Sequence, residues 1–208
     1  MRIEIMTATP NPLEIISRAA GICYGKRDAT PRRVWACFNR GHMSVFEHAV
    51  ASFEVEGISR ACLAQLTRHR LCSFCVESQR YCKYDLMGEN WYVIPPSFEH
   101  DQEYFRSCMQ DYASHYNVCV AGGMKPEDAR ALLPEAAKTR LVMTCNVRQL
   151  FHILDMRLAS DAQHEIRGLA RAMVEALKDY EQGADGVSGW VELLEMYEDA
   201  ERGGDRLD

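Results

Sequence analysis

The densest group of polar side chains in this sequence lies between Arg68 and Arg80. It opens with the tripeptide Arg68-His69-Arg70 and continues, after seven mostly apolar residues, with Ser78 and Arg80. Guanidinium groups present fixed forks that match phosphate oxygens in a bidentate way, and a hydroxyl group adds an orienting donor. Arginines and a serine in this order predict a site that holds a nucleotide phosphate.

The segment in front of this group has the pattern of a helix. Ser59 is a suitable N-cap, and apolar residues follow at helical spacing as far as Leu66, so we predict a helix that runs on toward Arg70. Successive helical residues are rotated by about 100°, so three consecutive polar side chains fan over roughly 200°. At least one side chain of the tripeptide must then point away from bulk water or toward a different partner, as contact with two ligands would require.

Strands are expected mainly in the first half of the chain. Residues 2–6, 49–56 and 91–94 have the composition of strands. In residues 49–56 apolar and polar side chains alternate, which is typical of a strand with one buried face. The apolar positions of that strand are Ala49, Ala51, Phe53 and Val55.

Besides the helix after Ser59, helices are expected over residues 12–23 and then almost continuously after residue 97. Asn146 is a suitable N-cap for one late helix, and Ser160 with Gln163 resembles a capping box that opens the next. The buried positions predicted for these two helices are Leu150, Phe151, Ile153 and Leu154, and then Ile166, Leu169, Ala170, Met173 and Leu177. The fold class is therefore α+β, with strands mainly in the N-terminal half and helices in the C-terminal half, and we expect a single domain over residues 1–208.

Composition narrows the class of protein. The chain has 208 residues, 47% of them hydrophobic and 26% charged, which is the balance of a globular protein. The net charge of −6 argues against a general nucleic-acid binder. No apolar run approaches the roughly 20 residues that cross a bilayer, and the first residues lack a signal-peptide pattern. Nine scattered cysteines fit a reducing compartment, so we expect a cytoplasmic protein without membrane or nucleic-acid partners.

The spacing Arg-His-Arg, seven residues, Ser, one residue, Arg is the signature of the flavin-dependent thymidylate synthases, and this sequence resembles that family. Other segments resemble the family at matching offsets, and only roughly the last twenty residues lack a clear match. These segments are Cys23-Tyr24-Gly25, residues 41–48, Ala129-Arg130-x-x-Leu133-Pro134, Asn146-Val147-Arg148 and Ala162-Gln163-x-Glu165-Ile166. The sequence departs from the family at Cys75, where Asn is frequent, and at Val76, where Glu or Gln is frequent.

The resemblance implies two sets of ligand contacts. Flavin adenine dinucleotide (FAD) would be contacted by His42, Ser44, Arg68, His69, Arg70, Asn146, Val147, Arg148 and His152, with His42 also near the folate. Deoxyuridine monophosphate (dUMP) would be held by Gln65, Arg68, Glu77, Ser78, Gln79, Arg80, Arg130 and Arg157.

Arg157 is the residue that the resemblance marks as catalytic, because it would lie against the uracil imide. A fixed cation there favours the imide anion, lowers its pKa and makes the ring a better carbon nucleophile.

The activity implied by the resemblance is the reductive methylation of dUMP to dTMP, a methyltransferase reaction. Methylenetetrahydrofolate would supply the carbon, and FAD reduced by NADPH would supply the hydride. Because the cofactor carries the redox chemistry, the protein has to position and stabilise, and no redox side chain is needed. The resemblance also implies a mixed β-sheet flanked by helices and a homotetramer whose active sites are shared between subunits.

One alternative uses the pair Cys72 and Cys75, a C-x-x-C motif with His69 and Cys82 nearby, as a zinc site or a dithiol redox centre. Structural zinc usually shows a second C-x-x-C or H-x-x-x-H, and thioredoxin-type motifs follow a strand in a βαβ unit; neither is found here.

Two further alternatives concern the arginines. They could be ordinary surface charges paired with acids such as Glu77 and Asp85. They could also form a non-enzymatic nucleotide-binding module with Tyr81, Tyr84 and Trp91 as stacking surfaces, although the acidic net charge counts against it.

Overall fold

The computed structural model describes residues 1–82, 86 and 88–203, and it describes side chains as far as residue 200. Tyr84 and Asp85 lie outside the described residues. The chain divides into two compact units. Unit 1 comprises Met1–Arg2, Val55–Arg68 and Phe74–Val142, and unit 2 comprises Ile3–Glu54, His69–Ser73 and the chain from Met143 onwards.

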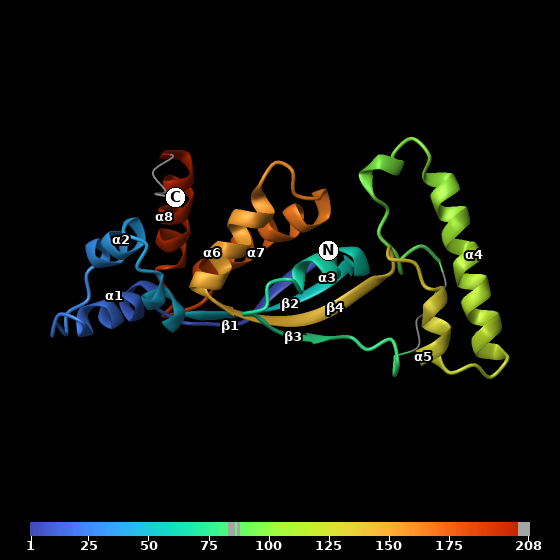
Figure 1. The fold of residues 1–208 in the computed structure, drawn as a ribbon, viewed down its shortest axis with the longest axis horizontal. Coiled ribbons are helices and arrows are strands. Elements are labelled where there is room, and N and C mark those ends of the chain that lie inside the picture. Colours follow the sequence, from blue (N-terminus) through green and yellow to red (C-terminus); the bar gives the residue numbers. More distant parts are fainter. Residues whose placement is uncertain (83–85, 87, 204–208) are drawn as a thin grey trace. The chain divides into compact units, whose positions relative to one another are not determined.

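Four strands and a set of helices and 3-10 turns make up the described chain (Figure 1). The strands are β1 (Arg2–Ala8), β2 (Val50–Ser59), β3 (Ser73–Val76) and β4 (Lys138–Asn146). The α-helices are α1 (Pro12–Ile22), α2 (Pro31–Asn39), α3 (Arg60–Leu66), α4 (Gln102–Ala121), α5 (Pro126–Ala129), α6 (Val147–Leu158), α7 (His164–Gly183) and α8 (Trp190–Gly203). The 3-10 turns are η1 (Met43–His48), η2 (Pro96–Phe98) and η3 (Arg130–Leu132).

The strands form one sheet in the order β1-β2-β4-β3. The chain direction alternates across it: Thr9 N donates to Val50 O at 2.9 Å, Val147 N donates to Ala49 O at 2.9 Å, and Glu77 N donates to Arg140 O at 2.9 Å. The α+β class is confirmed, and the sheet is antiparallel where a mixed sheet was expected.

The alternation expected in the second strand is confirmed. The four side chains expected on the buried face, in β2 and just before it, are at most 2% exposed: Ala49, Ala51, Phe53 and Val55. No helix within the described residues is both long enough and apolar enough to span a bilayer.

Strand β4 lies in a stretch that was expected to be helical, and this expectation is wrong. Its side chains alternate, with Thr139, Leu141, Met143 and Cys145 at most 3% exposed. This alternation was visible in the sequence, but the helical patterns on either side outweighed it. Conversely, the strand expected at residues 91–94 makes only an isolated bridge between Tyr92 and Ala137.

The helix in front of the arginine motif ends earlier than predicted. Ser59 is its N-cap as expected, since its hydroxyl oxygen accepts from Cys62 N at 3.0 Å. The helix then stops at Leu66, where Thr67 turns its hydroxyl back to Leu63 O and Arg68 N bonds to Gln65 O. The tripeptide of residues 68–70 therefore lies in a turn, not on a helix, and its side chains are not spaced by helical rotation.

The helices that follow β4 start at side-chain caps. Asn146 Oδ1 accepts from Gln149 N at 2.8 Å, which confirms the predicted cap of α6. Helix α7 is capped by Gln163, whose side-chain oxygen accepts from Glu165 N and Ile166 N. Ser160 was expected to be that cap, and this expectation is wrong because the chain is still in a turn there. The buried positions predicted for α6 and α7 are all confirmed.

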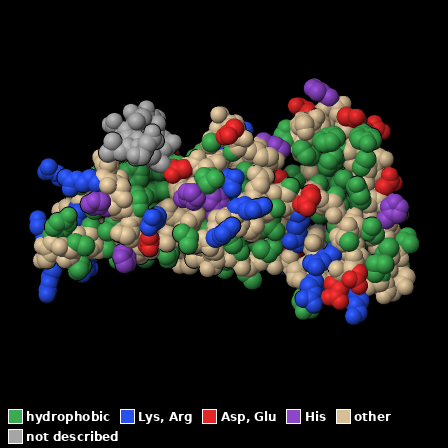
Figure 2. All heavy atoms as spheres, in the orientation of Figure 1, with side chains coloured by type: hydrophobic (Ala, Val, Ile, Leu, Met, Phe, Trp, Pro, Cys, Tyr) green, Lys and Arg blue, Asp and Glu red, His purple; other side chains and the backbone are tan. Residues whose placement is uncertain are grey.

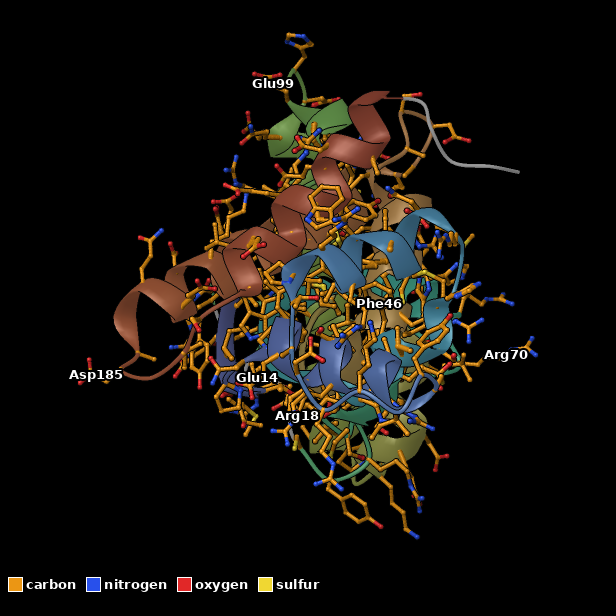
Figure 3. All side chains as sticks on the ribbon, turned by 90° about the vertical axis from the view of Figure 1, so that its left-hand side faces the viewer. Glu14, Arg18, Phe46, Arg70, Glu99 and Asp185 are labelled. Atoms are coloured by element: carbon orange, nitrogen blue, oxygen red, sulfur yellow. The ribbon has the colours of Figure 1, made fainter. Side chains whose placement is uncertain are left out.

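Helices α6 and α7 pack against each other within unit 2, and α6 also packs against η1. Phe46 from η1 is fully buried beside Phe151 from α6, with ring centroids 5.8 Å apart (Figure 3). Phe151 also stacks on Tyr197 of α8 at 5.0 Å. The apolar face of α6 is thus packed against η1, α7 and α8, and this packing fixes the positions of the polar residues on its other face.

Candidate active site

In unit 1, two arginines predicted to hold dUMP meet at one acidic residue. Arg80 Nε donates to the carboxylate of Glu127 at 3.2 Å, and Arg130 Nε donates to the backbone oxygen of Glu127 at 3.0 Å. Arg80 and Arg130 are far apart in sequence and both are exposed. The short helix α5, with the 3-10 turn after it, brings them together, so this surface offers two guanidinium groups to one anion.

The segment between β3 and Arg80 is held by its own hydrogen bonds. Ser78 Oγ accepts from Arg80 N at 3.2 Å, which tightens the turn. Glu77 N donates to Arg140 O, and the Glu77 carboxylate pairs with Arg140 Nε at 3.3 Å. Gln79 is half-buried beside them. These contacts fix the position of the Ser78 hydroxyl and of the exposed Arg80.

The alternative in which the arginines are ordinary surface charges paired with acids is only partly correct. Arg80 does pair with an acid, but that acid is Glu127, while Glu77 pairs with Arg140. Of the other predicted nucleotide ligands in unit 1, Gln65 is half-buried at the end of α3, and Arg68 is exposed in the turn that follows.

In unit 2, the ring of His69 lies at the centre of a buried polar group. Its side chain is only 3% exposed, although Arg70 beside it is exposed and reaches into solvent (Figure 3). Arg157 Nε donates to His69 Nε2 at 3.0 Å, and the Gln149 amide lies 3.4 Å from His69 Nδ1. The ring of His152 meets it edge-on, with centroids 5.6 Å apart. The expectation that one member of the tripeptide points away from water is confirmed.

These contacts decide which nitrogen of His69 carries the proton. Because Nε2 accepts from Arg157, it holds a lone pair, and the proton of a neutral ring must be on Nδ1. The Gln149 amide nitrogen Nε2 lies 3.4 Å from Nδ1, and turning this amide by 180° would place its oxygen where it accepts the Nδ1 proton.

Burial, and after it the charges of Arg157 and His152, together lower the pKa of His69 from its ordinary value to about 4. The imidazole is therefore neutral at physiological pH and remains a hydrogen-bond acceptor for Arg157.

A cavity of about 480 Å³ lies in unit 2. Three predicted flavin ligands line it, namely His42, Ser44 and Arg148, together with Cys23 and Tyr24 of the segment after α1. Arg148 Nη1 also contacts the Glu47 carboxylate at 2.6 Å. The cavity is within the size range of small-molecule sites.

The remaining predicted flavin residues belong to α6 or its cap. Asn146 is partly buried as the cap, and His152 is exposed one turn after Arg148. Val147 differs, since its side chain is 1% exposed and its N–H is bonded to Ala49 O. On the face drawn in Figure 2, histidine and basic side chains gather over α6.

The C-x-x-C alternative does not fit the geometry. Cys75 lies in β3 and is exposed, whereas Cys72 precedes the strand and its thiol is hydrogen-bonded to Cys145. Residues three apart in an extended segment point to opposite faces, so these two thiols cannot share a metal ion. Among the residues that the structure describes, no group of three His, Cys, Asp or Glu side chains could hold a metal.

The stacking surface proposed for a nucleotide-binding module is also not formed as expected. Trp91 is only 6% exposed and belongs to the apolar core of unit 1. Tyr81 is 80% exposed, under the Arg80 guanidinium at 5.5 Å from the ring centroid.

Three residues of this region were not predicted from the sequence: Glu127, Gln149 and Glu47. Each holds a predicted ligand through a contact between residues distant in the chain, and no local pattern marks such a partner. A weak signal existed for Gln149, because it stands three residues after the Asn146 cap and one after Arg148.

Comparison with known proteins shows the family to which the sequence is similar. The family described as thymidylate synthase complementing protein (Thy1) matches residues 4–180. The flavin-dependent thymidylate synthase of Geobacter sulfurreducens is 37% identical, covering 86% of this chain and 82% of the relative. That of Pyrococcus furiosus is 36% identical, covering 85% and 79%.

This chain belongs to the flavin-dependent thymidylate synthase family. The family resemblance and the enzyme class are confirmed. A solved structure of thymidylate synthase X from Helicobacter pylori, with FAD and dUMP, superposes with a TM-score of 0.73 at 25% identity and covers 88% of this chain and 95% of that one. A flavin-dependent thymidylate synthase converts dUMP to dTMP, so the zinc, dithiol and non-enzymatic alternatives are set aside.

The state of His69 can be checked in this synthase by NMR with ¹⁵N-labelled histidine. We expect the His69 signal to show a proton on Nδ1 and a lone pair on Nε2 at neutral pH, and to titrate near pH 4. Loss of the signal in His69→Gln identifies it. A titration near the ordinary histidine value of about 6.5 would contradict the assignment.

Proposed function

We propose that this chain methylates dUMP with methylenetetrahydrofolate as the carbon donor and NADPH as the source of electrons for FAD. The contact between Arg157 and the buried, neutral His69 carries this proposal. It holds the residue expected to be catalytic against a residue of the arginine motif by a hydrogen bond to a neutral acceptor.

The residues of unit 2 fit a flavin nucleotide. The cavity lined by His42, Ser44 and Arg148 combines a hydroxyl group, an imidazole and a guanidinium group, which suit the polar and phosphate parts of such a cofactor. Asn146, His69, Arg70 and His152 lie at or near the start of α6 or in the turn beside it and would complete the flavin contacts. Val147 would contribute through its backbone oxygen, since its side chain is buried.

The residues of unit 1 fit the phosphate of dUMP. We propose that Arg80 and Arg130 exchange their contacts with Glu127 for the phosphate, with Ser78 as a further donor and Gln79 and the Glu77 backbone helping to position the nucleotide. An exposed ion pair contributes only about 0 to 1 kcal/mol, so its loss costs little when a dianionic group arrives. Gln65 and Arg68 would hold the rest of the nucleotide.

Arg157 would act on the uracil ring. A guanidinium group fixed near the imide stabilises negative charge there, which raises the electron density of the carbon that must attack the one-carbon unit. His69 orients this guanidinium group without neutralising it. The flavin, when bound, supplies the hydride that completes the methyl group, and the remaining work of the protein is to position the reactants and exclude water.

We further propose a cytoplasmic homotetramer whose active sites are shared between subunits, with residues 1–208 acting as one functional domain. The family resemblance supports this, as does the match to residues 4–180, which runs through both compact units.

The direct test is the purified chain itself. We expect a yellow protein whose visible spectrum shifts when dUMP is added and which forms dTMP once methylenetetrahydrofolate and NADPH are present. A colourless protein that fails to take up added FAD would refute the proposed function.

Replacing Arg157 separates catalysis from cofactor binding. Arg157→Ala should retain flavin absorbance and lose about 10²- to 10³-fold in kcat, the usual effect of removing one group that stabilises developing negative charge. The matched control is Arg171→Ala, an exposed arginine on α7, which should keep full turnover. Full activity in Arg157→Ala would disprove its catalytic role.

The phosphate site predicts a different pattern of kinetics. Arg80→Ala and Arg130→Ala should each raise KM for dUMP by roughly 10- to 100-fold, since a hydrogen bond to a charged group contributes about 1.5 to 3 kcal/mol. Flavin content should stay normal. Arg106→Ala, which removes the surface pair with Glu89 in the same unit, is the control. An unchanged KM in both variants would rule out this phosphate site.

A further inference from the structure

Two of the nine cysteines meet in unit 2, outside the ligand contacts described above. Cys72 is the residue before β3, and Cys145 is the penultimate residue of β4. Their thiols are hydrogen-bonded to each other. All cysteines that the structure describes are in the thiol form.

The register of the two strands explains the contact. Glu77 N donates to Arg140 O, and Cys72 lies as many residues before Glu77 as Cys145 lies after Arg140, so the cysteines are directly opposite. Cys72 N donates to His69 O instead of to β4, as expected at a non-hydrogen-bonded pair. In such pairs the Cα atoms are about 4.5 Å apart, which is within the range that a disulfide can bridge.

The two thiols differ in exposure and in acidity. Cys72 is partly exposed, and its pKa is lowered because the Cys145 thiol donates a hydrogen bond to its sulfur, against a smaller opposing effect of burial. Cys145 is 3% exposed, and the same hydrogen bond together with burial raises its pKa well above the ordinary value. A partly exposed, more acidic thiol beside a resolving thiol is the usual arrangement at redox-sensitive cysteines.

We propose that Cys72 and Cys145 form a modification site that reacts with peroxides and closes to a disulfide between the start of β3 and the end of β4. The Cys72 thiolate attacks the O–O bond of hydrogen peroxide, becomes a sulfenic acid and releases hydroxide, which takes up a proton to form water. Cys145 sulfur then attacks Cys72 sulfur, and the leaving hydroxide departs with the Cys145 proton as a second water. Two thiols are oxidised and one peroxide is reduced.

Closing the disulfide would also move residues of the candidate active site. The turn from His69 to Cys72 would be pulled toward the end of β4 as a sulfur–sulfur bond of about 2.05 Å replaces the hydrogen bond. Since His69 receives the Arg157 hydrogen bond, this shift disturbs the positioning of Arg157. Oxidation should therefore lower turnover, and dithiothreitol should restore it.

The test treats the purified flavin-containing protein with graded hydrogen peroxide, blocks remaining thiols and maps tryptic peptides by mass spectrometry. Cys72 falls in the peptide of residues 71–80 and Cys145 in that of residues 141–148. Because the first peptide also contains the exposed Cys75, the experiment is run in parallel on Cys75→Ser.

We expect the two peptides to become cross-linked, with the loss of two hydrogens, in wild type and in Cys75→Ser alike. Cys145→Ser should instead accumulate a sulfenic acid at Cys72 that dimedone traps, and Cys72→Ser should show neither product. The proposal is overturned if peroxide oxidises Cys75 or the exposed Cys23 before Cys72, or if the cross-link is absent in Cys75→Ser. Full turnover in completely cross-linked protein would disprove the effect on Arg157.

Discussion

The hydrogen bond between Arg157 and His69 is the interaction on which the arrangement of the candidate site depends. It joins the end of α6 to the turn that carries the arginine motif, at a ring that is almost fully buried. An unpaired imidazole in that position would leave a buried polar group without a partner, which costs about 1 to 3 kcal/mol. Arg157 donates to one ring nitrogen and the Gln149 amide lies 3.4 Å from the other, so burial of His69 and placement of Arg157 support each other.

The arginines of the two units are held in two different ways. Arg80 is paired with a carboxylate at the surface, and such a pair is weak, screened by salt and easily exchanged for a phosphate. Arg157 donates to a neutral acceptor in a partly buried position, and this hydrogen bond does not neutralise its charge. The first arrangement suits reversible binding of a substrate group, and the second suits stabilisation of charge that appears only during reaction.

The sequence was informative where the structure is determined by local chemistry. The caps at Ser59 and Asn146 and the buried stripes of α6 and α7 follow from hydrogen bonds and periodicity within one element, and all were predicted correctly. Strand β4 was missed because its alternating pattern competes with neighbouring helical patterns, and only pairing with β2 and β3 decides the outcome. The end of α3 at Leu66 was missed because the burial of His69, a long-range contact, favours a turn at that point.

The cysteines also show that neighbours in the sequence can point apart, while residues distant in the sequence can lie in contact. The pair Cys72 and Cys75 stands out in the sequence, but an odd spacing on an extended segment separates the two side chains onto opposite faces. Cys145 has no motif to mark it and lies far along the chain, yet strand register places it opposite Cys72. In an antiparallel sheet, therefore, the partner of a cysteine is set by which residues share a ladder position. This rule favours the chemistry of Cys72 with Cys145 over any chemistry that Cys72 and Cys75 would have to share.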